Sequence, residues 1–227
     1  MKIRSIILLV GILFLAGCST TSKIPKSEAY KGIYDEMPVT ILIMPPINRS
    51  TAVEAKEYFF VTLNVPLINK GYYVLPPFIT MDILKRESAY DAELFINGSL
   101  SKFGEIFGAD IALFTIIESW DKSAIGSFVK VGVEYLAKST KTNEVLYSRK
   151  GTISYDASIS TGVGGVFGAL ADLAASAINT AATEYVDVAR ACNNYTLGDF
   201  PSGKYSPTFK LDGVEMAGKN DFKVTIK

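Results

Sequence analysis

The side chains able to carry out covalent or acid–base chemistry are few in this chain. Its 227 residues include two cysteines, Cys18 and Cys192, and no histidine. Histidine is the usual general base near neutral pH and the commonest metal ligand, so its absence excludes Ser-His and Cys-His nucleophilic sites and argues against a metal centre. A hydrolase that uses carboxylates alone stays open, although no pair of acidic residues stands out from the other charges. The two thiols are therefore the first candidates for chemistry.

Cys18 ends a pattern that predicts attachment of lipid. Two basic residues precede an apolar or glycine run from Ile6 to Ala16, and a Leu-Ala-Gly tripeptide directly precedes the cysteine. This order is typical of a secretory signal, and the run is shorter than the roughly 20 residues that a membrane-spanning helix needs. The tetrapeptide is similar to the lipobox of bacterial lipoproteins, whose cysteine thiol receives diacylglycerol. We predict a signal peptide over residues 1–17 and lipidation at Cys18; the alternative is an ordinary secretory signal that happens to contain this cysteine.

The amino-acid composition restricts the classes of partner and cofactor that this chain could bind. Loss of residues 1–17 leaves 21 basic and 23 acidic side chains, a net charge of −2. Such a protein has no basic field with which to hold nucleic acid, so we predict no nucleic-acid partner. With Cys18 used by lipid, Cys192 cannot form an intrachain disulfide, and its helical apolar surroundings predict a small buried hydrophobe rather than an intermolecular disulfide. We expect no metal and no cofactor other than the covalent lipid on Cys18.

Three segments follow the predicted signal peptide. Residues 18–37 are polar and lack periodicity, which predicts a flexible tether. Residues 38–195 carry the strand and helix patterns of one α/β domain, and residues 196–227, rich in Gly, Pro, Asn and Lys, predict a tail that wraps the surface, with an edge strand over 222–226. By resemblance to sorting in Gram-negative cells, Ser19 in place of aspartate predicts a periplasm-facing anchor in the outer membrane.

The predicted domain is an α/β fold of a three-layer type. Apolar, β-rich runs at 39–44, 72–75 and 111–118, separated by helical patterns, predict parallel core strands joined by right-handed crossovers. Alternation from Val129 to Lys138 and a return run over 145–155 predict an antiparallel hairpin with one solvated face. The expected sheet is therefore mixed, with flanking helices. On the hairpin, the inward side chains would be Val129, Val131, Val133 and Tyr135, and the outward ones Lys130, Glu134 and Lys138.

A long helix is predicted over 166–193. Its apolar stripe, spaced three and four apart, should face the core. Small residues form a second surface that would let another protomer approach closely, although a hinge before the helix explains the glycines equally well. The stripe residues are Phe167, Leu170, Ala174, Ile178, Ala181, Tyr185, Val188 and Cys192; the residues of the predicted oligomer contact are Gly164, Gly168, Ala171 and Ala175.

Two predicted strands end in a Pro-Pro pair. Parallel strands joined by a crossover end at the same sheet edge, where open α/β sheets tend to bind ligands. Strand termination alone would also explain the prolines. As a partner- or ligand-binding hypothesis we take the group Pro45, Pro46, Asn48, Gly71, Tyr72 and Tyr73.

An ordered set of motifs runs from Met44-Pro45-Pro46-x-Asn48-x-Ser50 through Gly71-Tyr72-Tyr73-Val74-x-Pro76 to Phe107-Gly108-Ala109-Asp110 and covers about residues 38–195. As a set, these motifs resemble a family of bacterial lipoproteins typified by a meningococcal genome-derived antigen. The resemblance implies a fold similar to the amino-terminal domain of the Tol-system periplasmic protein and to the periplasmic part of curli-type secretion lipoproteins. It also implies a curli-channel-like lipoprotein and a second small lipoprotein as partners, and it brings no catalytic residues.

Three hypotheses of function remain. The leading one is a non-enzymatic, lipid-anchored adaptor that binds a curli-channel-like lipoprotein in an envelope or secretion complex, in which the chain could also form a homo-oligomer. The second is a module that binds a small molecule or cell-wall fragment at the Pro-Pro sheet edge. The third and weakest is a carboxylate-dependent hydrolase.

Overall fold

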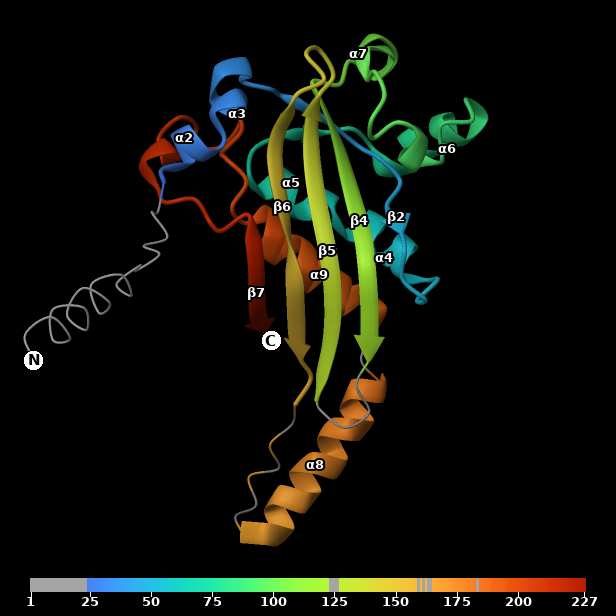
Figure 1. Ribbon diagram of the computed structural model, residues 1–227, viewed down its shortest axis with the longest axis vertical. Coiled ribbons are helices and arrows are strands. Elements are labelled where there is room, and N and C mark those ends of the chain that lie inside the picture. The colour runs from blue at the N-terminus through green and yellow to red at the C-terminus, as the bar shows by residue number, and fades with distance from the viewer. Residues whose placement is uncertain (1–23, 123–126, 159, 161, 163–164, 183) are drawn as a thin grey trace, which may run out of the picture.

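The computed structural model of the protein describes residues 24–122, 127–158, 160, 162, 165–182 and 184–227. Their centre is a seven-stranded mixed sheet in the order β3-β1-β4-β5-β6-β7, with β2 also paired to β4 (Figure 1). The pairs of β1 with β3, of β4 with β1 and β2, and of β6 with β7 are parallel, and β4-β5-β6 are antiparallel. The mixed α/β sheet predicted from the sequence is thus confirmed. The strands are β1 (Thr40–Ile43), β2 (Ile47–Asn48), β3 (Tyr73–Val74), β4 (Ile111–Lys122), β5 (Phe128–Ser139), β6 (Val145–Asp156) and β7 (Asp221–Ile226).

Helices cover the two faces of the sheet unequally. On one face, α4 (Ala55–Thr62), α5 (Asn64–Asn69) and α9 (Tyr185–Leu197) enclose the larger core. On the other, α6 (Pro77–Arg86), the 3-10 turn η1 (Ala92–Leu94) and α7 (Ser101–Phe107) enclose a smaller core against β1 and β4. No helix of the described residues lies in front of the rest of that second face, over β5, β6 and β7 (Figure 1).

The strand patterns place side chains as their periodicity predicts. Ile41, Leu42 and Ile43 are all fully buried, with Leu42 in the smaller core and its neighbours in the larger one, because β1 has helices on both sides. On β5 the four predicted inward residues are fully buried. Lys138 departs from the prediction: only 7% of it is exposed, because its ammonium donates to the carbonyl of Ile96 (2.7 Å) from the loop before α7.

A buried polar network joins three elements inside the larger core. The Asn193 amide of α9 donates to the Phe59 carbonyl (3.1 Å) and to the Thr62 hydroxyl (2.8 Å), both on α4. Its side-chain oxygen accepts the hydroxyl of Tyr135 on β5 (2.5 Å). Since Asn193 and Tyr135 are both fully buried, the network fixes how α9 crosses the sheet.

The N-terminal boundary of the folded body requires a correction. Residues 18–37 were predicted as a tether, but α2 (Lys26–Ala29) and α3 (Lys31–Glu36) pack on the body. Tyr30 and Ile33 enter the larger core, and the ammonium of Lys26 pairs with Glu215 (2.7 Å). Pro25 also bridges Met216 in antiparallel fashion. The polar composition gave no helical pattern, because helices this short are stabilised by the tertiary contacts of a few apolar residues rather than by periodicity. Residues 18–23 lie outside the described residues.

The predicted long helix is two helices. α8 (Gly165–Ala182) and α9 are separate, and Glu184, at the N-cap position of α9, has extended backbone angles (φ −73°, ψ 143°). Val188 and Cys192 in α9 are fully buried, as the stripe predicted. In α8, however, Leu170 and Ile178 are exposed, because the helix projects past the ends of β4, β5 and β6, away from the core (Figure 1).

The C-terminal residues complete the sheet. Phe200 is fully buried against Tyr147, and a 3-10 turn, η2 (Asp212–Val214), packs on α2. The edge strand predicted over 222–226 is present as β7 and is parallel to β6. Within the described ranges, no helix combines the length and apolarity needed to cross a bilayer.

Candidate interaction site

The most unusual surface of the molecule is one face of α8. Leu170, Leu173 and Ile178 are 58%, 57% and 71% exposed, and their spacing places them on one side of the helix, with Ala174 between them. Gly168 and Ser176, on the opposite side, are buried. The exposed side, Leu170, Leu173, Ala174 and Ile178, is hereafter the α8 face.

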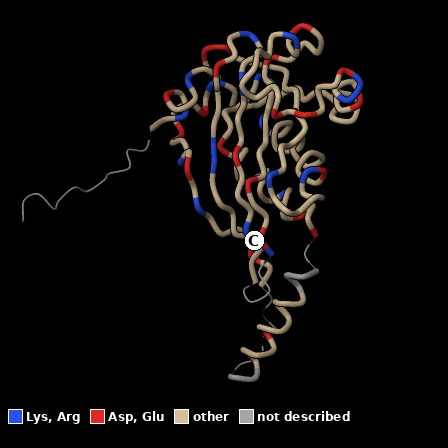
Figure 2. Tube along the Cα trace, turned by 45° about the vertical axis from the view of Figure 1, so that its right-hand side comes forward, with Lys and Arg blue, Asp and Glu red and all other residues tan. Residues whose placement is uncertain are grey.

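Charge is nearly absent from this helix. Asp172 is the only charged residue of α8, whereas basic and acidic side chains are scattered over the rest of the described body (Figure 2). A spacing of three and four with large aliphatic side chains is the pattern of a helix face that packs on protein. An apolar face held out in water costs free energy, so this one is suited to bind another apolar surface.

The structure separates the residues of the Pro-Pro hypothesis into two groups. Pro45 and Pro46 are buried after the C-terminal end of β1, whereas Gly71 and Tyr72 lie before the N-terminal end of β3. Because the two strands are parallel, these groups lie at opposite ends of the pair. The structure therefore does not gather the six residues around one crevice, and among them only Tyr73 has a largely exposed side chain, at 52%.

Each half of that group has a local structural role. The Asn48 side chain accepts the amide of Ser50 (3.0 Å) and donates to the carbonyl of Ala52 (2.8 Å), which shapes the turn before α4. Gly71 has φ +85°, and a Cβ there would lie 2.2 Å from the Ser206 nitrogen. The hydroxyl of the adjacent Tyr72 donates to the Pro201 carbonyl (3.1 Å), so this half holds the C-terminal segment in place.

The residues of the predicted oligomer contact and the two cysteines do not form a common surface in the described part of the chain. Gly168 is buried and Ala175 is half-buried, while Ala171 is exposed beside the α8 face. Gly164 and Cys18 lie outside the described residues. Cys192 is fully buried, and burial raises the pKa of its thiol well above the ordinary value, so it is unreactive, as expected for a small core side chain.

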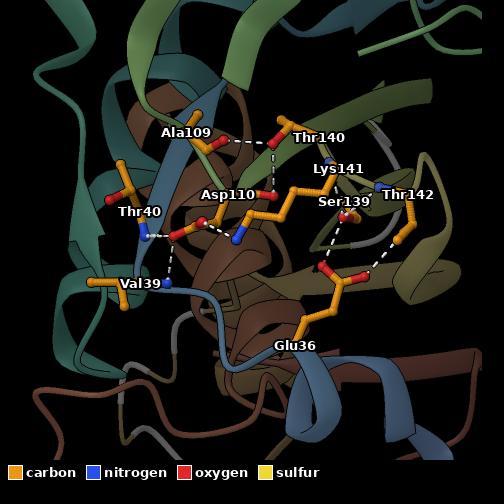
Figure 3. Close-up of polar contacts among 9 residues, drawn as sticks. All are labelled: Glu36, Val39, Thr40, Ala109, Asp110, Ser139, Thr140, Lys141 and Thr142. Carbon is orange, nitrogen blue, oxygen red and sulfur yellow. Dashed lines mark hydrogen bonds and ion pairs between the residues drawn. The ribbon is translucent and has the colours of Figure 1, made fainter. Parts of the chain in front are cut away.

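The carboxylate of Asp110 lies where β1, β4 and the β5–β6 turn meet (Figure 3). It accepts the backbone amides of Val39 (2.9 Å) and Thr40 (3.1 Å) and pairs with the Lys141 ammonium (3.0 Å). Partial burial opposes ionisation, but these donors outweigh it and hold the pKa of Asp110 below its ordinary value. Glu36 at the end of α3 binds the Ser139 and Thr142 hydroxyls of the same turn.

These contacts give Asp110 a structural role, because both of its carboxylate oxygens are already bound to backbone amides or to Lys141. We expect Asp110→Ala to lower the free energy of unfolding by about 2 kcal/mol at pH 7, because two backbone amides lose their acceptor. Since the folded-state pKa lies below the unfolded one, the stabilisation from ionised Asp110 is present above about pH 4 and lost as pH falls through the folded pKa. Urea unfolding between pH 3 and 7 measures this, and Asp110→Asn, which keeps an acceptor, should lack that acid dependence. Equal acid slopes for wild type and Asp110→Asn would contradict it.

One cavity has the character of a small-ligand site. It lies between the end of α6 and α7, has a volume of about 430 Å³, and is lined by Leu84, Phe95, Phe103, Ile106 and Phe107, with Glu87 and Lys102 among its polar residues. This size is within the usual range of ligand pockets. The sequence alone does not reveal the cavity, because its walls are brought together from α6, from α7 and from the segment between them.

Comparisons with known proteins agree with the predicted family. A family model described as "Putative lipoprotein GNA1162-like" matches residues 29–203. A curated relative from Neisseria meningitidis serogroup B, "Putative lipoprotein NMB1124/NMB1162", is 24% identical over 178 residues, which are 78% of this chain and 81% of the relative.

Several solved structures also match parts of the chain. Lipoprotein GNA1162 from Neisseria meningitidis has 22% identity and a TM-score of 0.48, covering 65% of this chain and 100% of that one. A PelC dodecamer from Paraburkholderia phytofirmans has 13% identity and a TM-score of 0.36, covering 66% and 86%. The LpoB C-terminal domain from Salmonella enterica has 14% identity and a TM-score of 0.38, covering 56% and 94%.

Proposed function

The chain belongs to the GNA1162-like family of lipoproteins, and from this premise we propose that it is a non-enzymatic adaptor held in the outer membrane by lipid on Cys18. In this proposal the folded body faces the periplasm and binds another envelope lipoprotein, of the curli-channel type. The chain's own residues supply a docking surface and no covalent step.

The α8 face is the observation that carries the proposal. The helix projects from the body, and its core-type stripe of Leu170, Leu173 and Ile178 is exposed in the described part of the chain. Its lack of lysine and arginine disfavours an anionic lipid surface as the binding partner, because helices that lie on membranes are usually basic. An apolar groove on a protein partner satisfies both features.

The test is extraction of the native protein in mild detergent, followed by mass spectrometry of what co-purifies. The proposal expects stoichiometric recovery of a channel-like lipoprotein. Recovery of the chain alone, or only as a homo-oligomer, from membranes that contain that lipoprotein would overturn the adaptor role.

Anchoring has a separate test. We expect Cys18→Ser to move most of the protein from the membrane fraction to the soluble periplasmic fraction, because acyl chains contribute about 0.8 kcal/mol per buried methylene. Cys192→Ser, which changes the buried thiol, should leave it with the membrane. Immunoblots of the separated fractions measure both variants, and membrane retention of Cys18→Ser would contradict the anchor.

A second candidate function, binding of a small apolar ligand, is favoured by the cavity between α6 and α7. If that cavity binds, 8-anilinonaphthalene sulfonate should fluoresce with the folded protein. Ile106→Arg, at a residue that lines the cavity and is 62% exposed, should abolish most of the signal. Equal fluorescence of the variant would show that the dye binds elsewhere.

A further inference from the structure

The outer edge of β7 is open within the described part of the chain. β7 is the last strand of the sheet, pairs with β6 in unbroken register, and contains no proline. The amide of Lys150 donates to the carbonyl of Asn220 (2.8 Å), so alternate residues from Asn220 onward turn their backbone groups toward β6. Asp221, Lys223 and Thr225 therefore direct their backbone N–H and C=O groups toward the free edge, which can pair with another strand.

A groove accompanies this edge on the face of the sheet that α9 covers. It has a volume of about 370 Å³ and lies between α9 and the end of β7, with Tyr155, Arg190, Tyr195 and Ile226 in its walls. Val224 and Ile226, whose side chains belong to this face, are only half-buried. A strand added beside β7 would direct every second side chain to this groove.

The lysines at the free edge of β7 favour a partner strand that carries acidic side chains. Lys219, Lys223 and Lys227 are exposed and share one strand parity, and Asp221 is the one acidic residue of the segment 219–227. Asp156 at the end of β6 lies near enough to Lys227 to interact with it, so the unopposed positive charge is that of Lys219 and Lys223. Among the described residues, neither Lys219 nor Lys223 forms an ion pair. A second copy of β7 would bring lysines together, and the chain's own residues 18–23 contain Lys23 and no acidic residue. Like charges opposite each other are destabilising, whereas carboxylates would be attracted.

We propose that the β7 edge binds an extended, acidic segment of a partner protein by strand addition. The partner strand alternates carboxylate side chains, beside the lysines, with apolar side chains that enter the groove between β7 and α9. This surface does not include α8, so the inference does not depend on the proposed adaptor contact.

The test uses the full chain in mild detergent and a labelled six-residue peptide of alternating glutamate and valine, with fluorescence anisotropy as the readout. We expect saturable binding that a peptide of alternating lysine and valine does not reproduce. Thr225→Pro removes one outward N–H without touching the β6 pairing and should weaken binding at least about tenfold. Thr225→Val keeps that N–H and should bind as wild type, and Lys223→Glu should weaken binding by a similar factor.

Backbone amide exchange by NMR supplies a readout that does not depend on a variant's fold. Added glutamate–valine peptide should slow exchange at Asp221, Lys223 or Thr225 more than at Phe222 and Val224, which already face β6. The proposal is overturned if the peptide does not bind, if the lysine–valine peptide binds equally well, or if Thr225→Pro binds unchanged. A tenfold gain in affinity on deletion of residues 19–23 would also overturn it, since the chain's own segment would then be the occupant.

Discussion

The double variant Leu170→Glu/Leu173→Glu is expected to reduce recovery of the proposed partner lipoprotein more than about tenfold, because burying two charges in an apolar interface costs several kcal/mol. Both side chains are more than half exposed, so the change should leave the melting temperature of the isolated protein within a few degrees of wild type. Quantitative mass spectrometry of the detergent-extracted complex measures the loss.

The matched control places the same two charges elsewhere. Val53 and Val214 are 84% and 79% exposed and lie outside α8. The double variant Val53→Glu/Val214→Glu should retain the partner, since it changes net charge equally without touching the α8 face. If both double variants retain it, α8 is not the contact; if both lose it, net charge rather than the α8 face controls recovery.

Replacing Asn193 by alanine is expected to lower the free energy of unfolding by about 3 kcal/mol, which for a domain of this size corresponds to about 10 °C in melting temperature. The variant removes the acceptor of the fully buried Tyr135 hydroxyl and the donor to the Phe59 carbonyl. Groups left buried without a partner account for most of the loss. Chemical denaturation followed by circular dichroism measures it.

A double-mutant cycle with Tyr135→Phe isolates the network. Tyr135→Phe alone should cost about 1 kcal/mol, and combined with Asn193→Ala the cost should be clearly less than the sum, because the stranded hydroxyl is gone. Strict additivity would mean that the two side chains stabilise the fold independently, against the 2.5 Å contact between them.

The parts of the fold that sequence periodicity predicted are those whose pattern and environment agree. The apolar run of β1 indicated burial on both faces, and the alternation of β5 indicated a sheet with one solvated face; both are found. Lys138 keeps the parity of that alternation but is covered by the loop that contains Ile96, a contact between distant residues that no local pattern encodes.

Helix α8 shows where the same reasoning fails. Leu170 and Ile178 have the spacing of core residues, and spacing cannot tell a face that meets its own core from one that meets a partner. Two features distinguish α8 from a helix of the core. It has no charged residue apart from Asp172, and the chain enters it through Gly162 and Gly165, which both have positive φ.

The prediction that the two strands next to the Pro-Pro pairs are parallel neighbours is confirmed. Gly71 and Tyr72 precede β3, however, whereas Pro45 and Pro46 follow β1, so the six residues lie at two ends of the strand pair and do not form one site.

The contact of Pro25 with Met216 has a consequence for the timing of synthesis. The neighbouring ion pair between Lys26 and Glu215 joins residues 189 positions apart in the chain. In the proposed export the N-terminal segment emerges first, whereas the residues that α2 contacts, 212–217, emerge almost last. Docking of α2 therefore requires a chain that is almost complete.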